Sequence, residues 1–102
     1  MRLSKTRSSG NVFRDLGFSR PEAEHLRVRA EMMVALEKAI RRLGVTQAQA
    51  AEVLGVTQPR VSALLGGRID LFSADTLIDM LARLGIDVRI VLKRSRRPVR
   101  VA

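Results

Sequence analysis

The chain has 102 residues, which is enough for one small hydrophobic core and makes a second independent core hard to stabilise. It contains no Cys, so disulfides, thiolate catalysis and most structural zinc sites are excluded, and no metal or other cofactor is expected. The net charge of +9 lies almost entirely in residues 1–10 and 93–102, which together carry +8 and leave the middle of the chain nearly neutral.

The first ten residues are predicted to form a flexible basic arm, because their Ser, Arg and Lys side chains bury too little apolar surface to order themselves. No apolar stretch follows them, and no segment is long enough to span a bilayer, so we expect a cytoplasmic protein without a membrane partner. Residues 11–18 contain two of the three Phe residues and are expected to pack on the domain, although they show no clear period.

The longest predicted helix begins at Ser19 and ends at Gly44. Ser19 and Glu22 have the spacing of a capping box with Pro21 between them, and Gly44 supplies a left-handed stop. Apolar residues recur at steps of three and four and form one stripe: Leu26, Ala30, Met33, Leu36, Ile40 and Leu43. The only histidine, His25, falls on the polar flank and is interpreted as a surface residue.

Three shorter helices are predicted to follow. Thr46 and Gln49 form a second capping box that opens a helix ending at Gly55. Thr57 is expected to cap the next helix, with Val61, Leu64 and Leu65 pointing inward, and Ser73 to cap a fourth that closes at Gly85. The inner face of the fourth helix is predicted to be Ala74, Leu77, Ile78, Leu81 and Leu84.

After Gly85 the apolar period changes to two, which predicts a β-strand with one covered face. A single strand needs a partner, and the sequence allows either residues 11–16 of the same chain or the equivalent strand of a second chain. The second arrangement would make a homodimer, with an interface formed by Val88, Ile90 and Leu92. The predicted fold class is therefore mainly α, with four or five helices and a C-terminal strand.

The second and third predicted helices are joined by a short turn at Gly55, so they must cross rather than run side by side. Ala51 is small enough for the crossing, and Gly55 stands where the turn needs positive φ. Residues 46–68 (TQAQAAEVLGVTQPRVSALLGGR) resemble the helix-turn-helix of the lambda-repressor-like, or XRE, family. Residues 11–17 and 84–91 also resemble small XRE-type regulators that include HigA-like antitoxins.

This resemblance implies a recognition helix that lies in the major groove of double-stranded DNA. Gln58, Pro59 and Arg60 would then occupy its first turn: Gln58 could pair with adenine, and Arg60 with guanine or a phosphate. Pro59 and Ala63 could contact a thymine methyl, whereas Gln47, at the start of the preceding helix, matches a phosphate-contacting position. The other expected contacts come from Thr57, Ser62 and Arg68.

Of two possible functions the sequence favours the first, because the net charge is basic and the acidic residues are scattered along the chain. The first is a dimeric, sequence-specific transcriptional regulator, acting as a repressor or autoregulator on a DNA operator. The second is an antitoxin whose main task is to neutralise a small ribonuclease toxin. An enzyme is not expected, since the sequence shows no nucleophile, metal cluster or phosphate-binding loop. For either function, residues 11–92 are predicted to form the folded domain. Residues 93–102 are predicted to form a basic tail that either binds phosphates or is simply solvated.

Overall fold

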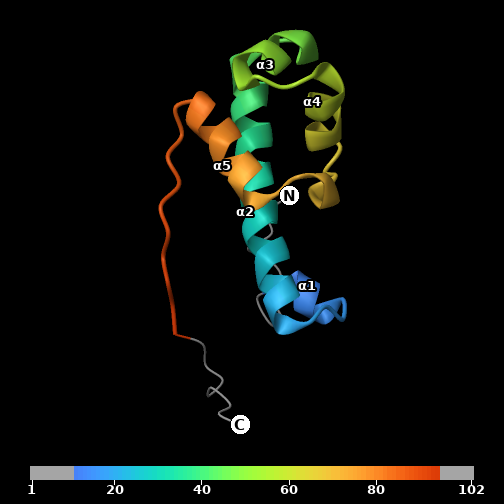
Figure 1. Cartoon of the computed structure of the whole chain (residues 1–102), viewed down its shortest axis with the longest axis vertical. Helices are drawn as coiled ribbons and strands as arrows, with labels where there is room; N and C mark the ends of the chain where they lie inside the picture. Colours follow the sequence, from blue (N-terminus) through green and yellow to red (C-terminus); the bar gives the residue numbers. More distant parts are fainter. Residues whose placement is uncertain (1–10, 95–102) are drawn as a thin grey trace.

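The computed structural model describes residues 11–94; the predicted basic arm at residues 1–10 and most of the predicted tail, residues 95–102, lie outside this range. Five α-helices and one 3₁₀ turn follow one another in the described chain (Figure 1). In order they are α1 (Val12–Asp15), α2 (Arg20–Leu43), α3 (Gln47–Leu54), α4 (Gln58–Leu65), η2 (Ile69–Leu71) and α5 (Ala74–Arg83). None of these helices is long and apolar enough to cross a membrane.

Helix α2, with 24 residues, is the longest helix of the described chain, and α1 lies near its N-terminal end and α3 at its C-terminal end (Figure 1). Its predicted ends are confirmed: the Ser19 hydroxyl accepts a hydrogen bond from the Glu22 amide, and Gly44 adopts the left-handed conformation with φ of 65°. The apolar stripe is buried from Met33 through Ile40, whereas Leu43 is half exposed.

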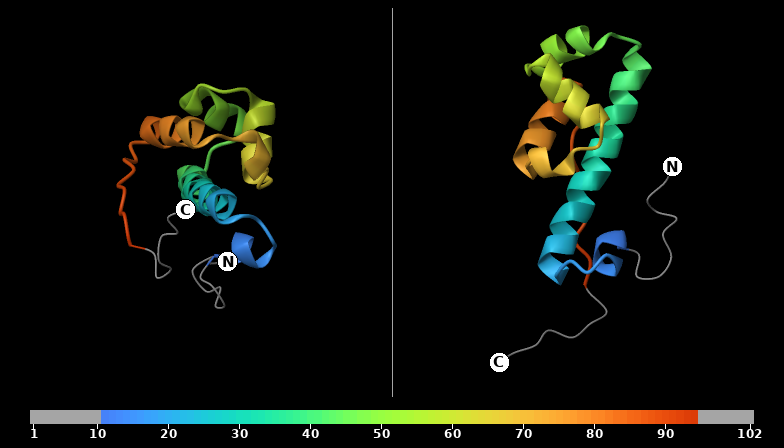
Figure 2. Two further views of the ribbon diagram at one scale, coloured as in Figure 1. Left: turned by 60° about the horizontal axis from the view of Figure 1, so that its bottom comes forward. Right: turned by 90° about the vertical axis from the view of Figure 1, so that its right-hand side faces the viewer.

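The core lies between α2, α3, α4 and α5, which wrap around one another at the C-terminal half of α2 (Figure 2). Its largest fully buried side chains are Phe72, Leu36, Leu54, Leu64, Leu77, Met80, Leu81 and Val61. Two of these were not expected from the sequence: Phe72 follows η2, and Met80 takes the inward position on α5. The predicted inner-face residue Ile78 is instead 41% exposed.

The predicted C-terminal β-strand is wrong: residues 85–94 form neither strand nor helix in the described chain. The backbone amide of Ile86 donates to the carbonyl oxygen of Leu81, which ends α5, and the segment then runs away from the helices (Figure 1). A strand needs hydrogen bonds from a neighbour, and residues 11–16, one of its two proposed partners, contain helix α1. Alternation of apolar residues alone could not supply those bonds.

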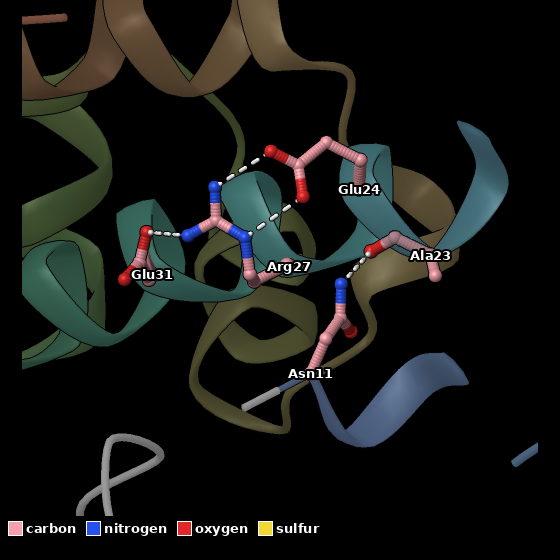
Figure 3. A network of polar contacts seen from close by, with 5 residues as sticks. All are labelled: Asn11, Ala23, Glu24, Arg27 and Glu31. Atoms are coloured by element: carbon pink, nitrogen blue, oxygen red, sulfur yellow. Dashed lines mark hydrogen bonds and ion pairs between the residues drawn. The ribbon is translucent and has the colours of Figure 1, made fainter. Parts of the chain in front are cut away.

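Helix α1 and the residues after it pack on the N-terminal end of α2, as expected for a segment with two Phe residues. The rings of Phe13 and Phe18 meet edge to face, with their centroids 6.3 Å apart. The Asn11 amide donates to the carbonyl oxygen of Ala23 at 3.3 Å, close to a ladder in which Arg27 bridges the carboxylates of Glu24 and Glu31 (Figure 3). The hydrogen bond from Arg27 lowers the pKa of Glu24, while that carboxylate raises the pKa of Arg27.

Candidate nucleic-acid interface

Helices α3 and α4 form the helix-turn-helix unit predicted from the sequence. The side chain of Gln49 accepts from the Thr46 amide at 2.9 Å, and the Thr46 hydroxyl accepts from the Gln49 amide at 3.1 Å, so the capping box at the start of α3 is complete. Gly55 ends α3 with φ of 69°, and the next amide, of Val56, donates to the carbonyl oxygen of Ala51. Ala51 is buried, as its small side chain at a helix crossing requires.

The first turn of α4 presents polar and apolar side chains to the outside. Gln58, Pro59 and Ser62 are exposed, whereas Val61 and Leu64 on the opposite side of the helix are 0% and 2% exposed. Ala63 is half-buried. Since the inner face is already filled by apolar side chains, Gln58 and Ser62 have no packing role in the core and remain available to a ligand.

Thr57 takes the predicted N-cap position of α4 but does not act as a cap. Its backbone is extended, with φ of −82° and ψ of 159°, yet its hydroxyl makes no capping hydrogen bond. The hydroxyl is therefore not committed to the free amides of the first turn, as those of Ser19 and Thr46 are.

Arg60 is held by its own chain. Its guanidinium donates to the carbonyl oxygen of Leu71 at 2.9 Å and lies over the Phe72 ring, 4.3 Å from the ring centroid. The side chain is half-buried, unlike that of Gln58. The structure thus brings Gln58 and Arg60 into the same turn but leaves only Gln58 unengaged.

Arg68 follows α4 and forms a two-pronged ion pair with Asp70, with N···O distances of 3.3 and 3.2 Å. The hydrogen bond from Arg68 lowers the pKa of Asp70, and the same bond raises the pKa of Arg68. Both side chains are exposed. Arg68 is therefore at the surface, as a phosphate ligand would be, with an acidic partner that the sequence reasoning did not assign to it.

Gln47 is the first residue of α3 and is exposed, while its neighbours Thr46 and Gln49 are occupied by the capping box. Another cation near the motif was missed from the sequence: Arg83 of α5 lies so close to the turn that a Cβ added at Gly55 would be 3.0 Å from its guanidinium carbon. Arg83 had no distinguishing pattern, since its proximity to Gly55 results from the packing of α5 against α3.

The three residues predicted to form a dimer interface lie on a different part of the molecule. Val88, Ile90 and Leu92 are 39%, 75% and 89% exposed, so the described chain leaves them largely uncovered. They belong to the segment that runs on the other side of α2 from α4 (Figures 1 and 2).

Comparisons with known proteins agree with this geometry. A family model described as a helix-turn-helix domain matches residues 12–93. A solved structure named as an XRE-family transcriptional regulator is 36% identical, with a TM-score of 0.68, and the match covers 80% of this chain and 92% of that chain. The comparison with curated proteins gave no significant match.

Proposed function

Because this chain belongs to the helix-turn-helix domain family and its fold is XRE-like, we propose that it is a sequence-specific regulator of transcription that binds double-stranded DNA. It places α4 in the major groove and acts as a dimer, in the role of a repressor or autoregulator. The observation that carries the proposal is the first turn of α4, where Gln58 and Pro59 face solvent while Val61 behind them is completely buried.

Each predicted contact residue other than Arg60 then takes a contact suited to its chemistry. Gln58 pairs through its amide with the N6 and N7 edge of adenine, and Pro59 and Ala63 offer apolar contact to a thymine methyl. The remaining residues contact phosphates, because their exposed side chains donate hydrogen bonds or carry positive charge at the starts of α3 and α4, within α4 and just after it. These are Gln47, Thr57, Ser62 and Arg68.

We prefer this function to the antitoxin alternative because of the charges along α2. An acidic surface for a basic toxin would need a continuous group of carboxylates, yet along α2 the carboxylates alternate with arginines: Glu24 and Glu31 pair with Arg27, and Glu37 pairs with Arg41. The exposed polar turn of α4, in contrast, is what DNA reading requires.

The proposal is tested by selecting a preferred duplex from a randomised DNA pool with the wild-type chain and then measuring Kd for that duplex and all its single-base-pair variants. Gln58→Ala should remove about 1–3 kcal/mol of discrimination at one or two adjacent base pairs. His25→Ala, an exposed change on α2, is the control and should leave the profile unchanged. A pool that yields no preferred duplex, or a Gln58→Ala profile identical to the wild type, would contradict the proposal.

A further inference from the structure

Residues 69–72 form a turn, here called the 69–72 turn, whose backbone carbonyls are held by arginines from two different helices. Arg29 of α2 donates from Nη1 to the carbonyl oxygens of Ile69 and Phe72, both at 3.2 Å. Arg60 of α4 donates from Nη1 to the carbonyl oxygen of Leu71 at 2.9 Å. Ile69 begins and Leu71 ends the 3₁₀ turn η2, and Phe72 follows it. The Ile69 carbonyl also accepts from the Phe72 amide, so the two arginines add to a turn that makes few backbone hydrogen bonds.

The same turn contains the largest buried side chain of the core, and Arg60 covers it. Phe72 is only 1% exposed, and the guanidinium carbon of Arg60 stands 4.3 Å from the centre of its ring. This distance places the cation over the ring face, where the ring quadrupole attracts it. Arg60 is thus joined to the turn by a charge-assisted hydrogen bond and by a cation–π contact.

At the start of α4, Val61 is buried in the core, but the Thr57 side chain makes no capping hydrogen bond. The Arg60 contacts therefore connect the first turn of α4, which carries Gln58, to the 69–72 turn, and Arg29 connects that turn to the long helix α2. The three elements are linked in one chain of contacts that runs from α2 to the outward face of α4.

From this arrangement we infer that Arg29 and Arg60 form an arginine clamp on the 69–72 turn that orients α4 for DNA. Arg60 is then a positioning residue rather than a base contact, and this inference rests on the proposed DNA-binding function. If Arg60 reached a base, it would have to give up the Leu71 carbonyl and uncover Phe72, so binding would cost two interactions that the free protein already makes.

The direct test follows Arg60 and Phe72 by NMR, in the free protein and in complex with the duplex selected by the wild-type chain. We expect the chemical shifts of the Arg60 Nε–H and of the Phe72 ring protons to be nearly the same in the complex as in the free protein, because the clamp remains closed. Large shifts of both sets of signals in the complex, with new contacts from Arg60 to a base, would overturn the inference.

A second test compares Arg29→Ala, Arg60→Ala and the double variant on that duplex and on its single-base-pair variants over a series of salt concentrations. If the clamp is broken, Kd should rise about tenfold in each single variant, while the base-pair profile and the salt slope stay as in the wild type. Because both arginines act on the same turn, the Kd of the double variant should be close to that of either single variant. If Arg60→Ala instead flattens the profile at one base pair, Arg60 reads a base; if it lowers the salt slope by about one, it binds a phosphate. Either result would overturn the inference.

Controls separate this inference from the proposed function. Arg27→Ala removes an arginine of the same helix as Arg29 whose bonds within residues 11–94 go to Glu24 and Glu31 of α2, and it should change Kd by less than about twofold. Where an alanine variant does not fold, Arg29→Met or Arg60→Met keeps a long apolar stem in place and removes the guanidinium, with its donors and its charge. In the free protein, Arg29→Ala should shift the Arg60 Nε–H signal; an unmoved signal would refute the clamp, whereas a pool that yields no preferred duplex would refute the proposed function instead.

Discussion

At the scale of single residues, the ion pair between Arg68 and Asp70 sets how much positive charge the end of α4 offers to DNA. We expect Asp70→Asn to free Arg68 and to tighten binding to all duplexes by a factor of about 3 to 10, with a salt slope steeper by about one. The pair is exposed, so the melting temperature should hardly change. The measurement is Kd against salt concentration for the selected duplex and for a random one.

Asp87→Asn is the control for that experiment, because it removes the same charge from the exposed segment after α5. Equal tightening by both variants would show that only net charge matters. Because the hydrogen bond from Arg68 lowers the pKa of Asp70, the ion pair persists at neutral pH and breaks only as the pH falls through that lowered pKa.

The exposure of Gln58 and Val61 could be predicted from the sequence, whereas the contact partners of Arg60 could not. Helical spacing was enough to expect Gln58 outside and Val61 inside, and the structure places both so. The contacts of Arg60 depend on Leu71 and Phe72, which come from a turn with no periodic pattern. Those residues reach Arg60 only because the core folds Phe72 inward, and no local spacing reports such packing.

At the scale of elements, the start of α4, where Thr57 makes no capping hydrogen bond, is a position at which one substitution should raise the stability of the protein and lower its affinity for DNA. Thr57→Asp places a carboxylate beside the free amides of α4, and we expect it to stabilise the helix by about 0.5–1 kcal/mol and to raise Tm by several degrees. The same charge would face phosphates, so DNA affinity should fall at least about tenfold. Thermal unfolding and Kd are measured on one preparation.

The matched control is Ser73→Asp, which adds the same charge at the N-cap of α5, a position already capped by the Ser73 hydroxyl. It should change Tm and Kd far less than Thr57→Asp. Equal losses of affinity in both variants would mean that the start of α4 does not face DNA phosphates.

Helix ends were predictable because caps are local, as Ser19, Thr46 and Gly44 illustrate. The strand was not, because a strand is defined by bonds to another segment rather than by its own residues. In residues 11–16 the Asn11 side chain accepts a hydrogen bond from the Phe13 amide and caps helix α1. This segment is therefore a helix and cannot be the strand partner that the prediction allowed within the same chain.

At the scale of the whole molecule, the long helix α2 keeps the proposed DNA-reading unit and the segment after α5 on opposite sides (Figures 1 and 2). The described core beneath α3 and α4 is made of Leu, Met, Val, Ala and Ile side chains together with Phe72. The path of the segment after α5 could not be predicted, because it makes few contacts that the sequence pattern could specify.

The dimer proposed for this regulator rests on the apolar residues of that segment. A single α4 reads only a few base pairs, so useful specificity needs two copies about 34 Å apart on one face of the duplex. Ile90 is 75% exposed and Leu92 is 89% exposed. Contact with a second copy of the chain would remove these apolar side chains from water, which favours a dimer. We therefore expect Ile90→Asp to yield a monomer and to weaken binding to the selected duplex at least about 100-fold.

Arg89→Ala changes the neighbouring exposed residue and should leave both properties intact. Sedimentation equilibrium gives the mass of each variant, and Kd is measured on the full selected duplex and on one of its halves. The Ile90→Asp variant should bind the half-site as well as the wild type does, because its α4 is untouched and only the second copy is lost. A monomeric Ile90→Asp variant with undiminished affinity for the full duplex would show that one copy suffices, and a dimeric one would place the interface elsewhere.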